Sequence, residues 1–307
     1  MPMQSALHPA SHGAELMSSF AWLLFVGGGA IFLFVMGLAV YAVVSRPRAV
    51  SVRRWIVGGG LVFPAIVLTA LFFHSADIST ALAHDEAPNA MKIEVVGKRW
   101  WWEVRYTSPD GSSHTVLANE LRLPVGCVAD ITLTTDDVIH SFWVPALAGK
   151  VDMIPGHRNR LVVHANREGV YRGQCAEFCG GQHAQMAFQV VVESAETFRK
   201  WLQHESGPAV EAATSTTQLG REVFMQSGCA TCHAIRGTSA SGRLGPDLTH
   251  VGSRRTLAAG MLDNHAGTME GWIADSQRLK PGNLMPAMNV MPAHELRALA
   301  TYLASLQ

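Results

Sequence analysis

Two long apolar segments near the start of the chain, residues 20–44 and 55–73, contain no charged residue. Each is long enough for a helix to cross a bilayer core of about 30 Å. The ten residues between them contain no acid and four arginines, and such a short basic loop stays on the cytoplasmic side: Arg46, Arg48, Arg53 and Arg54. We therefore predict a two-helix transmembrane hairpin, with both chain termini on the extracytoplasmic side.

A cleaved signal peptide is the alternative interpretation of the first apolar segment. Against it, the segment is longer than a usual signal core, and no basic stretch precedes it. Arginines, rather than a cleavage site, follow it. The hairpin interpretation gives an N-terminal unit over residues 1–84.

From about residue 91 the sequence changes to short β-prone runs separated by turn residues, such as IEVVG, CVADITLTT and MAFQVVVES. This pattern predicts an all-β, antiparallel sandwich or barrel over residues 85–205. Cys127 stands alone in one of the apolar runs, and we interpret it as a buried core residue. The small and polar residues 206–217 predict a flexible linker.

Residues 218–307 have a helical pattern. The last helix places four leucines on one face, which indicates packing in a helical core: Leu296, Leu299, Leu303 and Leu306. The fold class expected for the whole chain is therefore a membrane multidomain protein, with a helical hairpin, an all-β sandwich and an all-α C-terminal domain.

The formal net charge is zero, which argues against nucleic acid as a partner. Residues 85–205 hold 12 Lys/Arg and 15 Asp/Glu, whereas residues 216–307 hold 8 and 6, so the two soluble parts differ in sign. They could dock weakly on each other, or the charges could be ordinary solvated surface.

The segment CAEFCGGQHAQM, residues 175–186, brings five potential metal ligands into twelve residues. Thiolate, thioether and imidazole donors together suit copper better than zinc. His140, about 35 residues earlier in the run HSFWVP, could supply a second imidazole. A Cys175–Cys179 disulfide and a structural zinc site of two Cys and two His remain as alternatives.

The pattern C-x-E-x-C-x3-H-x2-M, preceded by HSFWVP, resembles the binuclear copper (CuA) signature of cytochrome c oxidase subunit II, and the resemblance covers roughly residues 5–205. It implies a cupredoxin-like fold for the sandwich and two coppers bridged by two thiolates. By position, the resemblance implies Cys175 and Cys179 as the bridging ligands and His140 and His183 as the terminal imidazoles. It implies Met186 and the backbone carbonyl of Glu177 as the weak axial ligands.

The same resemblance implies two further roles. The Glu177 side chain would face a magnesium or manganese site at the boundary with subunit I, unless it is a solvated loop acid. Trp100, in the tract GKRWWWEVRY, matches the family's tryptophan through which electrons reach copper. The three tryptophans could instead be sandwich packing, and strand alternation predicts that Trp101 faces away from Trp100 and Trp102.

The chain departs from the family at two positions. Many members carry a glutamate near the start of the second span, where this chain has Val57. The family also often has Pro-Gly-Arg where this chain has Pro155-Gly156-His157. Proton uptake at the subunit I boundary is therefore expected to be arranged differently. Neither position holds an expected copper ligand.

Cys229-Ala-Thr-Cys232-His233 is a c-type haem attachment motif, in which both thiols bind the haem and the histidine is an axial ligand. A thioredoxin-type redox pair is the alternative, but it expects a βαβ context that the sequence lacks. The runs LGPDLTHVG and KPGNLMP resemble the middle and the methionine loop of class I cytochromes c. This resemblance implies Met285 as the sixth ligand, with Met288 and Met291 as rivals.

The combined resemblance is to the subunit II of caa-type oxidases. It implies an electron relay in the bacterial cytoplasmic membrane, with haem c taking electrons from a small cytochrome or a quinol-oxidising complex. The expected partners are oxidase subunit I, where O₂ is reduced, subunit III and membrane lipid. A copper-delivery or redox-sensing protein and a relay subunit of a nitric oxide reductase are the competing hypotheses.

Overall fold

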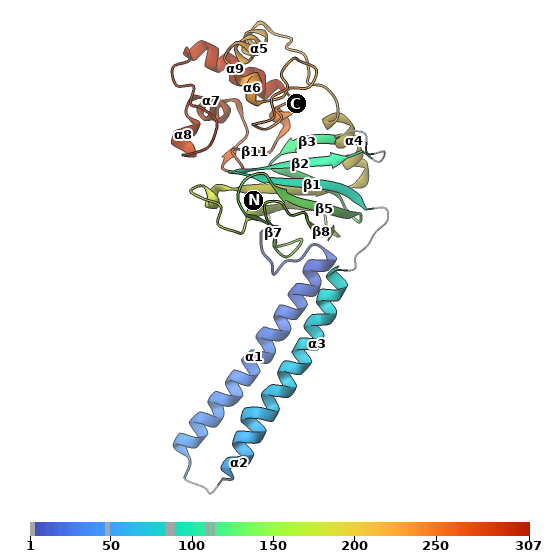
Figure 1. Cartoon of the computed structure of the whole chain (residues 1–307), viewed down its shortest axis with the longest axis vertical. Coiled ribbons are helices and arrows are strands. Elements are labelled where there is room, and N and C mark those ends of the chain that lie inside the picture. Colours follow the sequence, from blue (N-terminus) through green and yellow to red (C-terminus); the bar gives the residue numbers. More distant parts are fainter. Residues whose placement is uncertain (1–3, 47–49, 84–89, 109–110, 112–113) are drawn as a thin grey trace.

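The computed structural model describes residues 4–46, 50–83, 90–108, 111 and 114–307. A helical hairpin is followed by a β-sandwich and then by a C-terminal helical domain (Figure 1). This order confirms the fold class expected from the sequence. Arg48 and the expected boundary at residues 84 and 85 lie outside the described residues.

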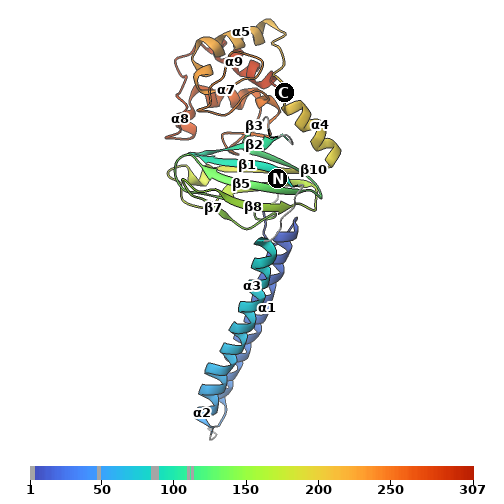
Figure 2. The same ribbon diagram turned by 45° about the vertical axis from the view of Figure 1, so that its right-hand side comes forward.

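The hairpin consists of two long apolar arms that lie side by side and end at the sandwich (Figure 2). The first arm is α1 (His12–Val44), and the second runs through α2 (Val52–Arg54), η1 (Trp55–Val62) and α3 (Phe63–Ala83). Both arms are long and apolar enough to cross a membrane, with hydropathies of 2.5 and 2.3. The helices extend beyond the apolar runs at the sandwich end, where the Ser11 side chain caps the Ala14 N–H of α1.

The residues before α1 attach the hairpin to the sandwich. Ala10 and Ser11 are buried. The Ala10 N–H donates to the Ala146 carbonyl at 2.8 Å, and the Asn166 N–H donates to the Ala10 carbonyl at 3.0 Å. The Ser11 hydroxyl donates to the Leu147 carbonyl. Backbone hydrogen bonds therefore fix the start of the first helix to the β domain, in addition to the covalent connection along the chain.

Two five-stranded sheets form the sandwich in the part of the chain that the structure describes. The first sheet has the order β3-β2-β1-β5-β8: β3 (His114–Ala118), β2 (Trp101–Thr107), β1 (Met91–Lys98), β5 (Val128–Thr135) and β8 (Asn159–His164). The second has the order β4-β10-β9-β6-β7: β4 (Glu120–Pro124), β10 (Ala187–Glu193), β9 (Gly169–Cys175), β6 (His140–Trp143) and β7 (Val151–Met153).

The expectation of a purely antiparallel sandwich was wrong at two strand pairs. Strand β1 pairs with β5 in parallel, and β10 pairs with β4 in parallel. Both pairings arise because the chain crosses from the first sheet to the second at β4 and returns at β5. Parallel neighbours require such a crossover, which a local pattern of strands and turns does not reveal.

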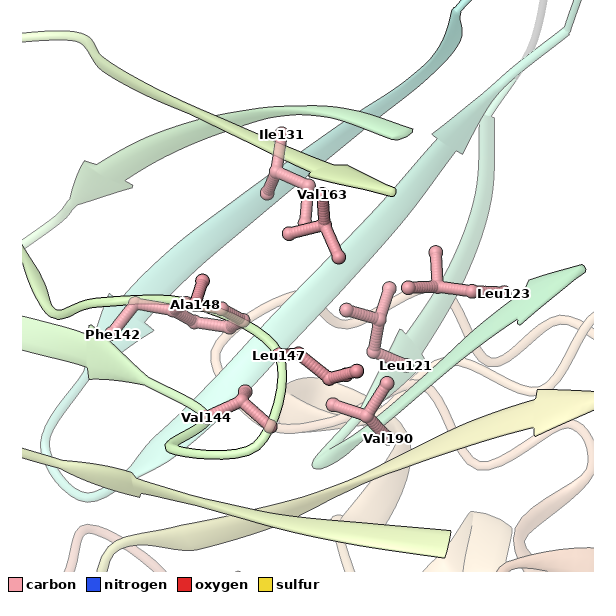
Figure 3. A pocket seen from close by; sticks show the side chains of 9 residues that line it. All are labelled: Leu121, Leu123, Ile131, Phe142, Val144, Leu147, Ala148, Val163 and Val190. Atoms are coloured by element: carbon pink, nitrogen blue, oxygen red, sulfur yellow. The ribbon is translucent and has the colours of Figure 1, made fainter. Parts of the chain in front are cut away.

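Aromatic side chains fill the core between the sheets. Trp102 is fully buried, and its ring centroid lies 5.0 Å from that of Phe188. Trp102 belongs to the core cluster and its β2 neighbour Trp101 does not, as strand alternation predicted. Trp100 also belongs to the cluster, but it lies in the turn before β2. Figure 3 shows the aliphatic side chains and Phe142 that line a small cavity in this core. The cavity measures about 10 Å³. Because small-molecule sites measure hundreds of Å³, this cavity is not a ligand site.

Cys127 is exposed, so its assignment to the core was wrong. It lies in the turn before β5, where its N–H donates to the Pro124 carbonyl. The strand formed by this apolar run begins only at Val128, so Cys127 lies outside the strand.

The C-terminal domain is built around the crossing of two helices, α5 (Ser215–Gln226) and α9 (Ala293–Ser305). All four leucines expected on the inner face of the last helix are buried. The remaining elements are short: α6 (Cys229–Cys232), η3 (Val251–Ser253), β11 (Thr256–Leu257), β12 (Leu262–Asp263), α7 (Ala266–Ala274) and α8 (Ser276–Leu279).

Helix α4 (Ala195–Glu205) ends the sandwich, and the segment after it is bound along the C-terminal domain. Arg236 donates to the carbonyls of Glu205 and Gly207, and the Ala209 N–H donates to the Arg236 carbonyl at 2.9 Å. Helix α5 begins within residues 206–217, because Thr214 and Thr217 form a capping box. This segment therefore differs from the free tether that its composition predicted.

We expect Gly220→Ala to destabilise the C-terminal domain by about 1–3 kcal/mol. An added Cβ would lie 2.1 Å from the Ala298 carbonyl oxygen and 2.6 Å from the Tyr302 Cβ. Native-state hydrogen exchange of the α5 and α9 amides measures this loss.

The matched control is Gly271→Ala in α7, where no atom lies within 4 Å of the added Cβ. Because alanine favours a helix over glycine by about 1 kcal/mol, this control should be neutral or stabilising. Equal effects of the two substitutions would contradict close α5–α9 packing as the reason for Gly220.

Candidate functional site

The loop between β9 and β10 carries most of the expected metal ligands. Cys175 is the last residue of β9, and its N–H donates to the Met186 carbonyl at 2.9 Å, which closes the loop. The short helix η2 (His183–Gln185) turns His183 back toward the cysteines. His140 begins β6, the neighbour of β9, and therefore lies beside the loop although it is distant in sequence.

The two thiols are close but not bonded, with their Sγ atoms 3.7 Å apart. A disulfide requires about 2.05 Å, so the structure does not contain one here. With metal–sulfur bonds of about 2.3 Å, this separation gives an S–metal–S angle of about 107°, close to tetrahedral. Both sulfurs can therefore bind the same metal ion.

The two imidazoles lie next to different sulfurs. The His140 Nδ1 is 3.8 Å from the Cys175 Sγ, and the His183 Nδ1 is 3.6 Å from the Cys179 Sγ. Among the described residues, ligand atoms of His140, Cys175 and Cys179 lie within 4.8 Å of one another, and His183 does not join that group. One tetrahedral ion would hold all four ligand atoms within about 4 Å of each other. The arrangement therefore favours two ions that share the thiolates over a single zinc.

Two weaker donors complete the cluster. The Met186 Sδ lies 3.8 Å from the Cys179 Sγ, and the Glu177 carbonyl oxygen lies 3.2 Å from the Cys175 Sγ. Met186 and both cysteines are buried. The structure thus brings together all six residues expected at this centre.

The Glu177 side chain points away from the cluster to Lys150. Its Oε2 lies 3.5 Å from the Lys150 Nζ, which also contacts Asp152 at 2.9 Å. The carboxylate is about half exposed. A protein cation therefore lies beside the carboxylate that was expected to face a divalent metal.

Hydrogen bonds inside the cluster shift the acidity of its members. The bond shared with Cys179, and then the one with His140, lower the pKa of the Cys175 thiol. The same shared bond, together with burial, raises the pKa of Cys179. The pair therefore retains one proton, and a cation must replace that proton for both sulfurs to be thiolates.

His140 is oriented by residues that the sequence motif did not indicate. Its Nε2 lies 2.8 Å from the Asp137 Oδ1, which leaves Nδ1 for the metal. Burial lowers the pKa of His140, but the bonds to Asp137 and Cys175 outweigh it and raise the pKa. A Cβ at Gly97 would lie 2.8 Å from the His140 ring, so only glycine fits there. The D-x-x-H spacing was the available signal for Asp137.

Trp100 lies directly against the metal loop. It is 9% exposed, and its Nε1 donates to the Cys179 carbonyl at 3.0 Å. The indole is thus joined by one hydrogen bond to the backbone of a thiol ligand.

The haem attachment motif forms the short helix α6 and the turn after it. The His233 Nδ1 lies 2.7 Å from the Pro246 carbonyl, so it donates there and Nε2 remains available for iron. Burial lowers the pKa of His233, which keeps the imidazole neutral at pH 7. The run LGPDL therefore supplies the acceptor that sets the histidine tautomer.

The loop with Met285 is held by three side-chain bonds. Ser276 and Gln277 donate to the Met285 carbonyl at 2.8 and 2.7 Å, and the Met285 N–H donates to Asn283 at 2.8 Å. Cys229, Met285, Met288 and Met291 pack against the same core cluster. The donor set therefore fits a covalent haem.

Two family models match the chain. Residues 110–195 match the model described as cytochrome c oxidase subunit II, periplasmic domain, and residues 217–307 match the model described as cytochrome c. The first family implies a CuA centre and the second implies haem c.

Curated relatives are named cytochrome c oxidase subunit 2. The chain is 37% identical to one from Alkalihalophilus pseudofirmus and 30% identical to one from Bacillus subtilis, over 71% and 72% of this chain. These alignments span 62% and 64% of those longer relatives. A probable cytochrome c oxidase subunit 2 of Rickettsia bellii is 31% identical over 70% of this chain and 89% of its own length. The chain therefore belongs to the cytochrome c oxidase subunit 2 family, with a cytochrome c domain after the periplasmic domain.

Proposed function

We propose that this chain is the electron-relay subunit of a respiratory haem–copper terminal oxidase. In this proposal electrons from a donor reach haem c, pass to a binuclear copper centre and continue to subunit I, where O₂ is reduced to water. The observation that carries the proposal is the pair of thiols 3.7 Å apart with one imidazole beside each, in the same chain as a haem attachment motif.

In this proposal copper would be held by the thiolates of Cys175 and Cys179, the imidazoles of His140 and His183, and the weaker donors Met186 and the Glu177 carbonyl. The haem ligands and attachment sites are Cys229, Cys232, His233 and Met285. When bound, the two centres supply one-electron redox chemistry. The residues themselves hold the donors in place and exclude water, since the thiols and His140 are buried.

The proposed organisation follows the expected boundaries, with residues 1–84 in and near the membrane, 85–205 for copper, 206–217 as connection and 218–307 for haem. The one adjustment is that helix α5 of the haem domain already begins at Ser215. Both soluble domains lie on the extracytoplasmic side of a bacterial cytoplasmic membrane. Subunit I, subunit III and a donor cytochrome or quinol-oxidising complex are the proposed partners. A magnesium or manganese ion shared with subunit I would have to displace Lys150 from Glu177, which lies 3.5 Å away.

The full chain, purified with its partner subunits, tests this function. Metal analysis should give two coppers in this chain, with a paramagnetic resonance pattern of one electron shared between them, and one low-spin haem c. The complex should consume O₂ rather than NO. A mononuclear copper signal, zinc, or NO consumption would sink the proposal.

Trp100→Phe should slow haem-to-copper electron transfer by about tenfold or more, equivalent to about 1.4 kcal/mol. The substitution keeps an aromatic ring but removes the Nε1 donor to the Cys179 carbonyl. Flash-induced reduction of the haem, followed by copper absorbance, gives the rate. Trp101→Phe, on a half-buried side chain outside the core cluster, is the control. An unchanged rate in Trp100→Phe would remove Trp100 from the path.

Asp137→Ala should weaken copper binding by about 10- to 100-fold, because outer partners of ligand histidines have effects of that size. The reason is the loss of the 2.8 Å bond that orients His140. Competition with a copper chelator measures the affinity. The neighbouring Asp136→Ala, whose side chain is mostly exposed and pairs with Lys98, should bind copper normally. Equal affinities for the two variants would argue against this role of Asp137.

A further inference from the structure

Lys280 is a buried lysine of the C-terminal domain whose ammonium group reaches into the sandwich. It is 3% exposed. Its Nζ donates to the carbonyls of Trp100 at 2.8 Å, Gln185 at 2.9 Å and Ala258 at 3.1 Å. An ammonium group has three donors, so these three carbonyls satisfy it completely.

Two of these acceptors belong to the copper domain, and they flank the proposed copper site. Trp100 is the indole joined to the Cys179 carbonyl, and Gln185 directly precedes the ligand Met186. The third acceptor, Ala258, lies in the lysine's own domain. One side chain therefore ties the two domains together next to the copper loop.

The residues after Lys280 continue the same contact. The Gln182 Nε2 donates to the Pro281 carbonyl at 2.9 Å. A Cβ at Gly282 would lie 3.5 Å from the Trp100 ring, so the loop backbone rests on the indole. The loop reaches Met285 three residues later. The methionine loop of the haem domain thus covers the face of Trp100 through which the copper domain would accept electrons.

A backbone bond supports the contact from a second segment. The Ala187 N–H donates to the Ala259 carbonyl at 3.0 Å. Arg255 adds bonds to Gln189 at 2.9 Å and to Glu120 at 3.2 Å at the margin. Among these groups of the C-terminal domain, Lys280 places a buried charge in the contact, and a buried charge is costly without its partners. Burial lowers the pKa of Lys280 to about 8, which leaves it protonated at pH 7.

We propose that Lys280 is a positioning residue that docks the haem domain on the copper domain, with the methionine loop held against Trp100. The haem domain of the same chain then occupies the electron-accepting face of the copper domain. An outside cytochrome delivers its electron to the haem domain and not to Trp100. The electron-transfer part of this inference rests on the proposed function of the two centres, whereas the docking part does not.

The experiment compares Lys280→Met with Lys200→Met in the full chain. Methionine keeps the length of the side chain but has no donors, and Lys200 is 76% exposed on α4 with one ion pair to Glu196. Hydrogen exchange of the Ala187 amide reports docking, and it can be measured without copper or haem. Lys280→Met should speed this exchange by about tenfold or more, since each hydrogen bond from a charged donor is worth more than a tenfold change. Lys200→Met should leave it unchanged.

The second readout is haem-to-copper electron transfer within the loaded chain. It should slow by about tenfold or more in Lys280→Met, with unchanged haem and copper spectra and unchanged exchange in α5 and α9. If Lys280→Met does not fold, Gln182→Ala removes a docking bond from the sandwich side and should give the same effects at smaller size. Unchanged Ala187 exchange, or faster exchange with an unchanged electron-transfer rate, would overturn the proposal. Failure of the wild-type chain to form a binuclear copper spectrum would instead overturn the proposed function, while the exchange result would still report docking.

Discussion

The arrangement of the metal cluster depends on the closure of one loop by the sheet beneath it. Strands β9 and β10 pair in antiparallel register, and the last bond of the pairing joins the Cys175 N–H to the Met186 carbonyl. The twelve residues from Cys175 to Met186 must therefore fold back on themselves above the end of the sheet. Two thiols, an imidazole, a thioether and a carbonyl are brought together by this closure, and only His140 has to come from another strand.

His140 is placed by the same sheet, because β6 pairs with β9 and Phe142 lies opposite Cys175. Its orientation is a separate matter and depends on close contacts from the first sheet. Gly97 in β1 leaves room for the ring, and Asp137 precedes β6 and accepts from its outer nitrogen. The proposed copper site therefore lies where both sheets meet, which explains why a rigid sandwich and not a free loop carries it.

Much of the fold and of the candidate site could be predicted because the signals are local. Apolar length indicates the hairpin, and the spacing of Cys175, Cys179, His183 and Met186 places four donors on one short loop. Contacts between distant segments could not be predicted in this way. The parallel pairing of β1 with β5 depends on a crossover. Trp100, whose carbonyl accepts from Lys280, is 180 residues away from it in the sequence. Cys127 was misassigned because apolar composition does not show where a strand begins.

The docked haem domain changes how the link between the two domains should be understood. A free tether of about a dozen residues would raise the local concentration of the haem domain to the millimolar range, and its orientation would remain random. Here the segment is bound through Arg236, and Lys280 fixes one orientation at the far end of the contact. A buried ammonium group that satisfies three carbonyls tolerates little displacement, because each lost bond leaves a polar group without a partner. The cost of burying that charge is thus offset only in one geometry, the one with the methionine loop on Trp100, and this makes Lys280 a determinant of orientation more than of affinity.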